Sequence, residues 1–237
     1  NKKKYHQKKF SLSMKYMDTC TNNNKRIILL TIFLLYTSMV VISLNVGLTA
    51  DVAHYALYGK FLSWGYVDHP PMIGWLQALF IHVFGKKNFY LHLAAFTTSL
   101  TILCITYQIS IKLFDNQRRD FGYFCVLSLF LSCVYYVISY ASLTQGPLIL
   151  FCLCSTYFLW QAITKESGRY LIAMNISLAC AGLSDYTAFL CAVGLYLYIV
   201  IYAPKLLKFK SLYVGMSILL LQQMLEYLKL HSLYILN

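Results

Sequence analysis

The chain is dominated by five long stretches with almost no charged residues. Four of them contain no Asp, Glu, Lys or Arg, and the remaining one holds a single carboxylate, Asp185, near its middle. The stretches cover residues 27–50, 88–111, 121–164, 170–204 and 211–225. In lipid, only helices and closed barrels satisfy every backbone polar group, and continuous apolar runs lack the alternation of a barrel strand. The sequence therefore predicts an all-α, polytopic helical membrane protein.

Composition agrees with this class. Hydrophobic residues make up 59% of the 237 residues and charged residues only 12%, whereas a soluble domain carries about 25% charged residues. The solvent for most of this chain is therefore expected to be lipid.

We expect about seven transmembrane helices, because a span needs about 20 apolar residues. The run at 121–164 is long enough for a hairpin, with its turn at Thr144–Pro147, where Gly and Pro interrupt the pattern. The run at 170–204 is also too long for one span, and Asp185 marks its turn. The expected spans are 27–48, 89–111, 122–142, 148–164, two within 170–204, and 211–225. Together they form a transmembrane domain at 27–237, preceded by a basic, cytosolic and disordered segment at 1–26.

The positions of Lys and Arg predict the orientation of these spans. With the N-terminus in the cytosol, 16 of the 20 basic residues fall on the cytosolic side, as the positive-inside rule requires. The net charge of +12 is thereby explained by topology, and no nucleic-acid-binding module is visible. The same threading places Asp51, Asp68, Asp185 and the turn at Gln145 together on the outer face.

The first outer loop, residues 50–88, contains the strongest candidates for a functional site. It carries Asp51, His54, Asp68 and His69, and ionisable groups beside a bilayer are functional candidates by default. Residues 51–64 and 71–85 are apolar and aromatic but too short to span easily, so we expect two helices lying in the membrane interface. The four ionisable side chains could also hold a divalent metal ion. The eight cysteines show no C-x-x-C pair, and we expect them to serve packing.

Two sequence runs in this loop resemble a known family. Asp51 stands at the outer end of the first span, followed by HYALYG at His54–Gly59 and GYVDHPPMIGWLQALF at Gly65–Phe80. This pattern resembles the GT-C membrane glycosyltransferases, in the branch that groups protein O-mannosyltransferases with the aminoarabinose lipid A transferase. The resemblance implies an enzyme that takes a sugar from a polyprenyl-phosphate carrier at the extracytoplasmic face. It also implies an integral protein of the bacterial inner membrane, with membrane lipid and the lipid-linked donor as partners.

The resemblance further implies roles for individual residues. Asp51 matches the family's catalytic acid residue and would act as general base on the acceptor. Asp68 and His69 match a second loop pair that lines the donor site, with His54 and Tyr55 beside them. The sugar and the acceptor stay undefined.

The chain departs from the family pattern at three positions. Val52 stands where a Glu is usual, Gln145 where an Asp is usual, and Asp185 where a Lys is usual. Members of the family are also considerably longer, which implies that this chain is a truncated N-terminal part. Two alternatives to the enzyme therefore stay open: a catalytically inactive remnant, and a non-enzymatic membrane protein that binds the carrier lipid.

Overall fold

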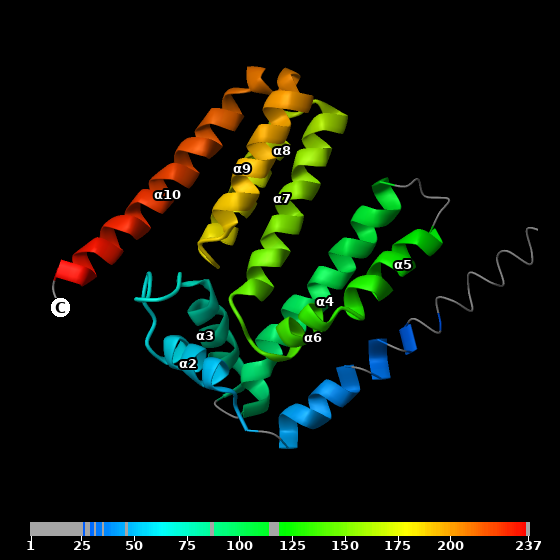
Figure 1. Ribbon diagram of the computed structural model, residues 1–237, viewed down its shortest axis with the longest axis vertical. Coiled ribbons are helices and arrows are strands. Elements are labelled where there is room, and N and C mark those ends of the chain that lie inside the picture. Colours follow the sequence, from blue (N-terminus) through cyan, green and yellow to red (C-terminus); the bar gives the residue numbers. More distant parts are fainter. Residues whose placement is uncertain are drawn as a thin grey trace, which may run out of the picture.

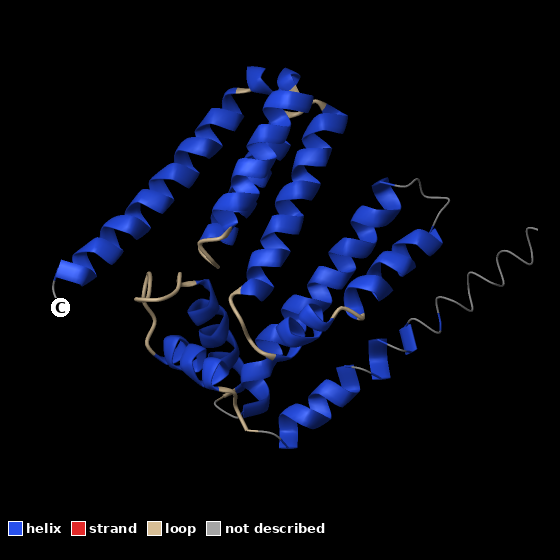
Figure 2. Ribbon diagram, in the orientation of Figure 1, coloured by secondary structure: helices blue, strands red, loops and turns tan. Residues whose placement is uncertain are grey.

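The computed structural model describes residues 26, 29–30, 32–34, 36–45, 47–85, 88–113 and 119–235. The predicted segment at 1–26 therefore lies outside the described residues, except for Arg26. Every regular element in the described part is a helix, in agreement with the predicted all-α class (Figure 2). After an apolar helix at Ile32–Asn45, the elements run in this order: α2 (Ala50–Lys60), α3 (Met72–Phe84), α4 (Asn88–Leu113), α5 (Arg119–Phe130), α6 (Cys133–Tyr140), α7 (Gln145–Lys165), α8 (Gly168–Gly182), α9 (Ala188–Tyr202), η1 (Pro204–Lys208) and α10 (Lys210–Ile235).

Two helices of the described part are long and apolar enough to cross a membrane, at Phe89–Leu113 and Gln145–Lys165. The number rises to four if two bent pairs each count as one span. One pair joins Ile32–Asn45 to α2 at 79°, and the other joins α5 to α6 at 71°. Helices α8 and α9 have 15 residues each, or about 22 Å at 1.5 Å per residue. The prediction of seven spans is therefore not confirmed, although the helical membrane class is.

The helix boundaries fall close to the expected turns, although residues 145–147, predicted as part of a turn, lie in the first turn of α7. Helix α7 begins at Gln145, directly after Thr144, and Pro147 fits in its first turn because the amide it lacks would have no intrahelical partner there. Asp185 lies in the turn between α8 and α9. Helix α3 follows Pro71 and ends at Gly85, whose φ of 96° favours glycine.

The break between α5 and α6 was not expected, because the sequence predicted one span at 122–142. Ser132 causes it locally, since its hydroxyl accepts a hydrogen bond from the Tyr135 amide at 3.2 Å and caps α6. A serine that caps a new helix competes with continuation of the preceding one.

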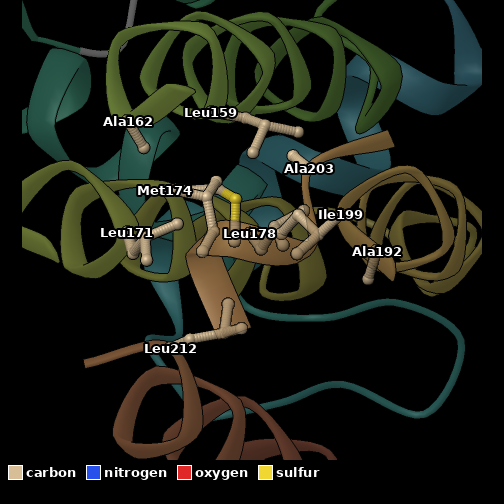
Figure 3. Close-up of a cluster of buried hydrophobic side chains, with 10 residues drawn as sticks. Leu159, Ala162, Leu171, Met174, Leu178, Ala192, Ile199, Ala203 and Leu212 are labelled. Atoms are coloured by element: carbon tan, nitrogen blue, oxygen red, sulfur yellow. The ribbon is translucent and has the colours of Figure 1, made fainter. Parts of the chain in front are cut away.

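The larger buried cluster joins the C-terminal helices. Met174 and Leu178 of α8 lie at its centre and pack against Leu159 of α7, Ile199 of α9 and Leu212 of α10 (Figure 3). A second cluster joins α4, α5 and α6 through Ile102, Leu103, Val126, Phe130 and Tyr135.

The connections gather at two opposite ends of the molecule. The α2–α3 hairpin, the α6–α7 turn and the α8–α9 turn lie at one end, and the α7–α8 connection and η1 lie at the other (Figure 1). The second end is basic, with Lys165, Arg169, Lys205, Lys208 and Lys210 in or beside these connections. The elements that carry Asp51, Asp68 and Asp185 thus lie at the end opposite this group of basic residues.

Candidate functional site

The predicted site residues lie on a hairpin formed by α2, the loop at 61–71, and α3. The two helices approach closely at Gly59, where an added Cβ would lie 2.7 Å from Gln77 Cβ and 2.9 Å from the Ala78 amide nitrogen. The loop is anchored by Tyr66, whose ring stacks on Tyr58 at 3.6 Å between centroids. Its hydroxyl donates to the Tyr58 carbonyl at 2.8 Å. The sequence therefore fixes the loop by a glycine contact and a tyrosine pair.

Asp68 accepts hydrogen bonds from two side chains on α2. His54 Nε2 lies 3.1 Å from one carboxylate oxygen, and the Tyr58 hydroxyl donates to the other. Partial burial would raise the pKa of Asp68, but the hydrogen bonds from Tyr58 and His54 and the nearby charge of His69 outweigh it, and the pKa lies below its usual value. Asp68 is thus held as a carboxylate that clamps the loop to α2.

His69 lies within hydrogen-bonding distance of Tyr55, and Tyr55 lies one helical turn after Asp51 on α2. The Nε2 atom of His69 lies 3.1 Å from the Tyr55 hydroxyl and 4.0 Å from an Asp68 oxygen. Tyr55 is buried, and burial raises its pKa together with the negative charges of Asp51, Asp68 and Asp185. The negative charges of these three carboxylates therefore all act on Tyr55.

Asp185 joins the α8–α9 turn, in which it lies, to the α6–α7 turn at the same end of the bundle. Its carboxylate accepts from Thr144 Oγ1 at 3.0 Å and from the Thr187 amide and hydroxyl at 2.9 and 2.7 Å. Burial opposes these bonds, yet they and the charge of His69 hold the pKa of Asp185 below its usual value. A backbone bond from the Met72 amide to the Leu183 carbonyl, at 3.0 Å, joins the hairpin to the same turn.

The structure places all five predicted site residues on this hairpin. It pairs His54 with Asp68 and Tyr55 with His69. Asp51 lies exposed in the first turn of α2, where Thr49 caps the helix. Sequence reasoning missed Tyr58, although its position one helical turn after His54 was a usable signal. In the described part of the chain, no group of three or more His, Cys, Asp or Glu side chains could hold a metal ion.

The clamp at Asp68 predicts a pH dependence of loop order. Because the folded-state pKa is lowered, the carboxylate stabilises the loop above the ordinary value of about 3.9 and loses this contribution as pH falls through the folded-state pKa. We expect the protection of amides at residues 61–71, measured relative to their intrinsic exchange rate at each pH, to fall on acidification in the wild type. Asp68→Asn should show low protection already at neutral pH and little further change. An identical pH response in both proteins would contradict the clamp.

Comparison with known proteins identifies the family. A model of the family described as dolichyl-phosphate-mannose-protein mannosyltransferase matches residues 68–225, which is two thirds of the chain. The match includes Asp68, His69 and both turns that Asp185 joins, and it begins after Asp51. No curated protein and no solved structure matched the chain. The matched segment shows that this glycosyltransferase-like membrane protein belongs to the dolichyl-phosphate-mannose-protein mannosyltransferase family.

Proposed function

We propose that the protein transfers a sugar from a polyprenyl-phosphate carrier to an acceptor at the extracytoplasmic face of the membrane. The observation that supports this most strongly is the cluster of Tyr55, His69 and Asp68 on the α2–α3 hairpin, which a backbone bond joins to the turn of Asp185, at the end of the bundle opposite its basic connections. The positive-inside rule supports a site on the outer face and an N-terminus in the cytoplasm. In a bacterium the membrane would be the inner membrane.

The reaction needs a base on the acceptor side and a positive or hydrogen-bonding group on the leaving phosphate. In the proposal, Asp51 takes the proton from the acceptor hydroxyl as its oxygen bonds to the anomeric carbon. The bond from that carbon to the carrier phosphate breaks, and the phosphate leaves with the electron pair. His69 stabilises the departing phosphate by hydrogen bonding, and Tyr55 orients His69. Asp68 and His54 hold the loop that presents it.

An assay of sugar transfer tests this proposal. The protein is reconstituted in proteoliposomes with radiolabelled polyprenyl-phosphate mannose, and loss of label from the lipid fraction is followed. We expect turnover by the wild type and strongly reduced turnover by His69→Ala. A donor that is bound but never consumed would reject the enzyme.

A second candidate is a non-catalytic protein that binds the carrier lipid. It is favoured by the three departures from the family pattern, Val52, Gln145 and Asp185, which replace polar groups expected for the transfer reaction, whereas the lipid chain of the carrier does not need them. This candidate predicts photo-crosslinking to a polyprenyl-phosphate analogue without turnover. It also predicts that Asp51→Asn leaves the crosslink unchanged.

A further inference from the structure

A pocket of about 380 Å³ opens at the tip of the α2–α3 hairpin. It is lined by Leu62, Ser63, Trp64 and Trp75, none of which carries a charge. Its volume falls within the range of about 300–1,000 Å³ that is typical of ligand sites. None of the residues assigned above to the sugar-transfer site lines it.

The walls of the pocket suit a hydrocarbon better than a sugar or a phosphate. The Trp75 indole N–H donates to the Ser63 carbonyl at 3.1 Å, which satisfies its one donor and leaves the ring faces for packing. Trp64 meets Trp75 edge to face at 5.3 Å between ring centroids. None of the lining side chains is cationic, whereas two indole rings offer a large apolar contact.

The surroundings of the pocket place it next to lipid. Phe61, Leu62, Trp64 and Val67 have between 61 and 72% of their surface exposed. Such a group of large apolar side chains on a hairpin tip marks a contact surface. The hairpin follows one apolar helix and precedes the spanning helix α4, and tryptophan concentrates where membrane and water meet. A membrane lipid can therefore reach the pocket directly.

The pocket is connected to the site by a short chain of contacts. The Ser63 amide donates to the Tyr66 hydroxyl at 3.2 Å, Tyr66 stacks on Tyr58, and Tyr58 donates to Asp68. A lipid with its chain among the tryptophans can thus direct its headgroup toward the part of the loop that carries His69. The carrier of the proposed reaction is a lipid phosphate with a single chain, which needs only one apolar pocket of this kind.

We infer that the Trp64–Trp75 pocket binds the phosphate-proximal part of the isoprenyl chain of the sugar carrier. This inference rests on the proposed lipid-linked donor and adds the place where its chain is held. The pocket would then select the carrier by its chain, while the hairpin residues act on its phosphate and sugar.

A photo-crosslinking experiment with farnesyl phosphate carrying a diazirine in its chain tests the inference. The protein is held in phosphatidylcholine nanodiscs, irradiated, digested and mapped by mass spectrometry. We expect labelled peptides from residues 61–75. Trp64→Ser and Leu62→Ser, both at exposed positions, should each lower that label by roughly tenfold, as expected for loss of about 1.4 kcal/mol of apolar contact. Leu79→Ser, an equally exposed apolar position on α3, is the matched control and should keep the label.

Competition by unlabelled compounds distinguishes the possible occupants of the pocket. Unlabelled farnesyl phosphate should remove the label, and inorganic phosphate or lysophosphatidylcholine should not. Equal competition by lysophosphatidylcholine would show a general lipid contact and overturn the inference, as would labelling that Trp64→Ser and Leu62→Ser leave unchanged. Asp51→Asn should retain the label. If the wild type is labelled at residues 61–75 but transfers no sugar, the proposed enzyme activity is rejected and the inferred binding of the lipid chain in the pocket is retained.

Discussion

Replacement of Asp51 with Asn is expected to lower the rate of sugar transfer by roughly 10²–10⁴-fold, the usual contribution of a positioned general base. The amide has nearly the same shape as the carboxylate but cannot accept the acceptor proton. Asp51 lies exposed in the first turn of α2, and the helix is capped by Thr49. The substitution should therefore leave the hairpin folded, and the loss should appear in turnover with little change in donor binding.

Initial rates in proteoliposomes, with lipid-linked mannose as donor, provide the measurement. Glu166→Gln is the matched control, because Glu166 is also an exposed carboxylate but lies after α7, at the basic end. It should transfer at the wild-type rate. If Asp51→Asn also transfers at that rate, Asp51 has no part in the mechanism.

Replacement of Gly59 with Val is expected to separate α2 from α3 and to remove activity with it. The first added carbon would lie 2.7 Å from Gln77 Cβ and 2.9 Å from the Ala78 amide nitrogen. That backbone atom cannot rotate away, so the helices must move apart. Overpacking of this kind costs about 1–3 kcal/mol, and valine recovers only a small part of that through its better helix propensity than glycine. His54 and Tyr58 would then lose their hydrogen bonds to Asp68.

Hydrogen exchange in nanodiscs measures this change. Amides of α2 and α3 should exchange faster in Gly59→Val, while those of α7 and α8 keep their wild-type rates. Gly194→Val on α9 is the control, since it makes the same substitution within a helix where nothing lies within 4 Å of the added Cβ. Unchanged exchange in α2 and α3 would show that the close contact at Gly59 does not hold the hairpin.

Much of the fold follows from local sequence features. Pro71 predicts the start of α3, Gly146 and Pro147 predict the turn before α7, and Asp185 predicts the turn after α8, because each of these residues acts on its own neighbourhood. The break at Ser132 was missed because a capping serine inside an apolar run looks the same as a serine within a continuous helix. Composition also did not settle the number of spans. One apolar run, 170–204, holds α9 and most of α8, and each of these helices has only 15 residues.

The candidate site was predictable as a list of residues but not as a set of contacts. Asp51, His54, Tyr55, Asp68 and His69 lie close in sequence, so their common hairpin is no surprise. The partner of each depends on tertiary packing, in particular on the contact at Gly59 and the stacking of Tyr66 on Tyr58. The hydrogen bond from Thr144 to Asp185 joins residues 41 positions apart, and no local sequence pattern specifies it.

Cysteine labelling in spheroplasts tests most directly whether the carboxylate end of the bundle faces the outside. Ser63→Cys and Tyr186→Cys report on that end, and Lys205→Cys reports on the basic end, each in a chain whose native cysteines are replaced by alanine. A membrane-impermeant maleimide should label positions 63 and 186 in intact spheroplasts, and position 205 only after permeabilisation. Labelling of position 205 in intact spheroplasts, with 63 and 186 protected until the membrane is opened, would contradict the account.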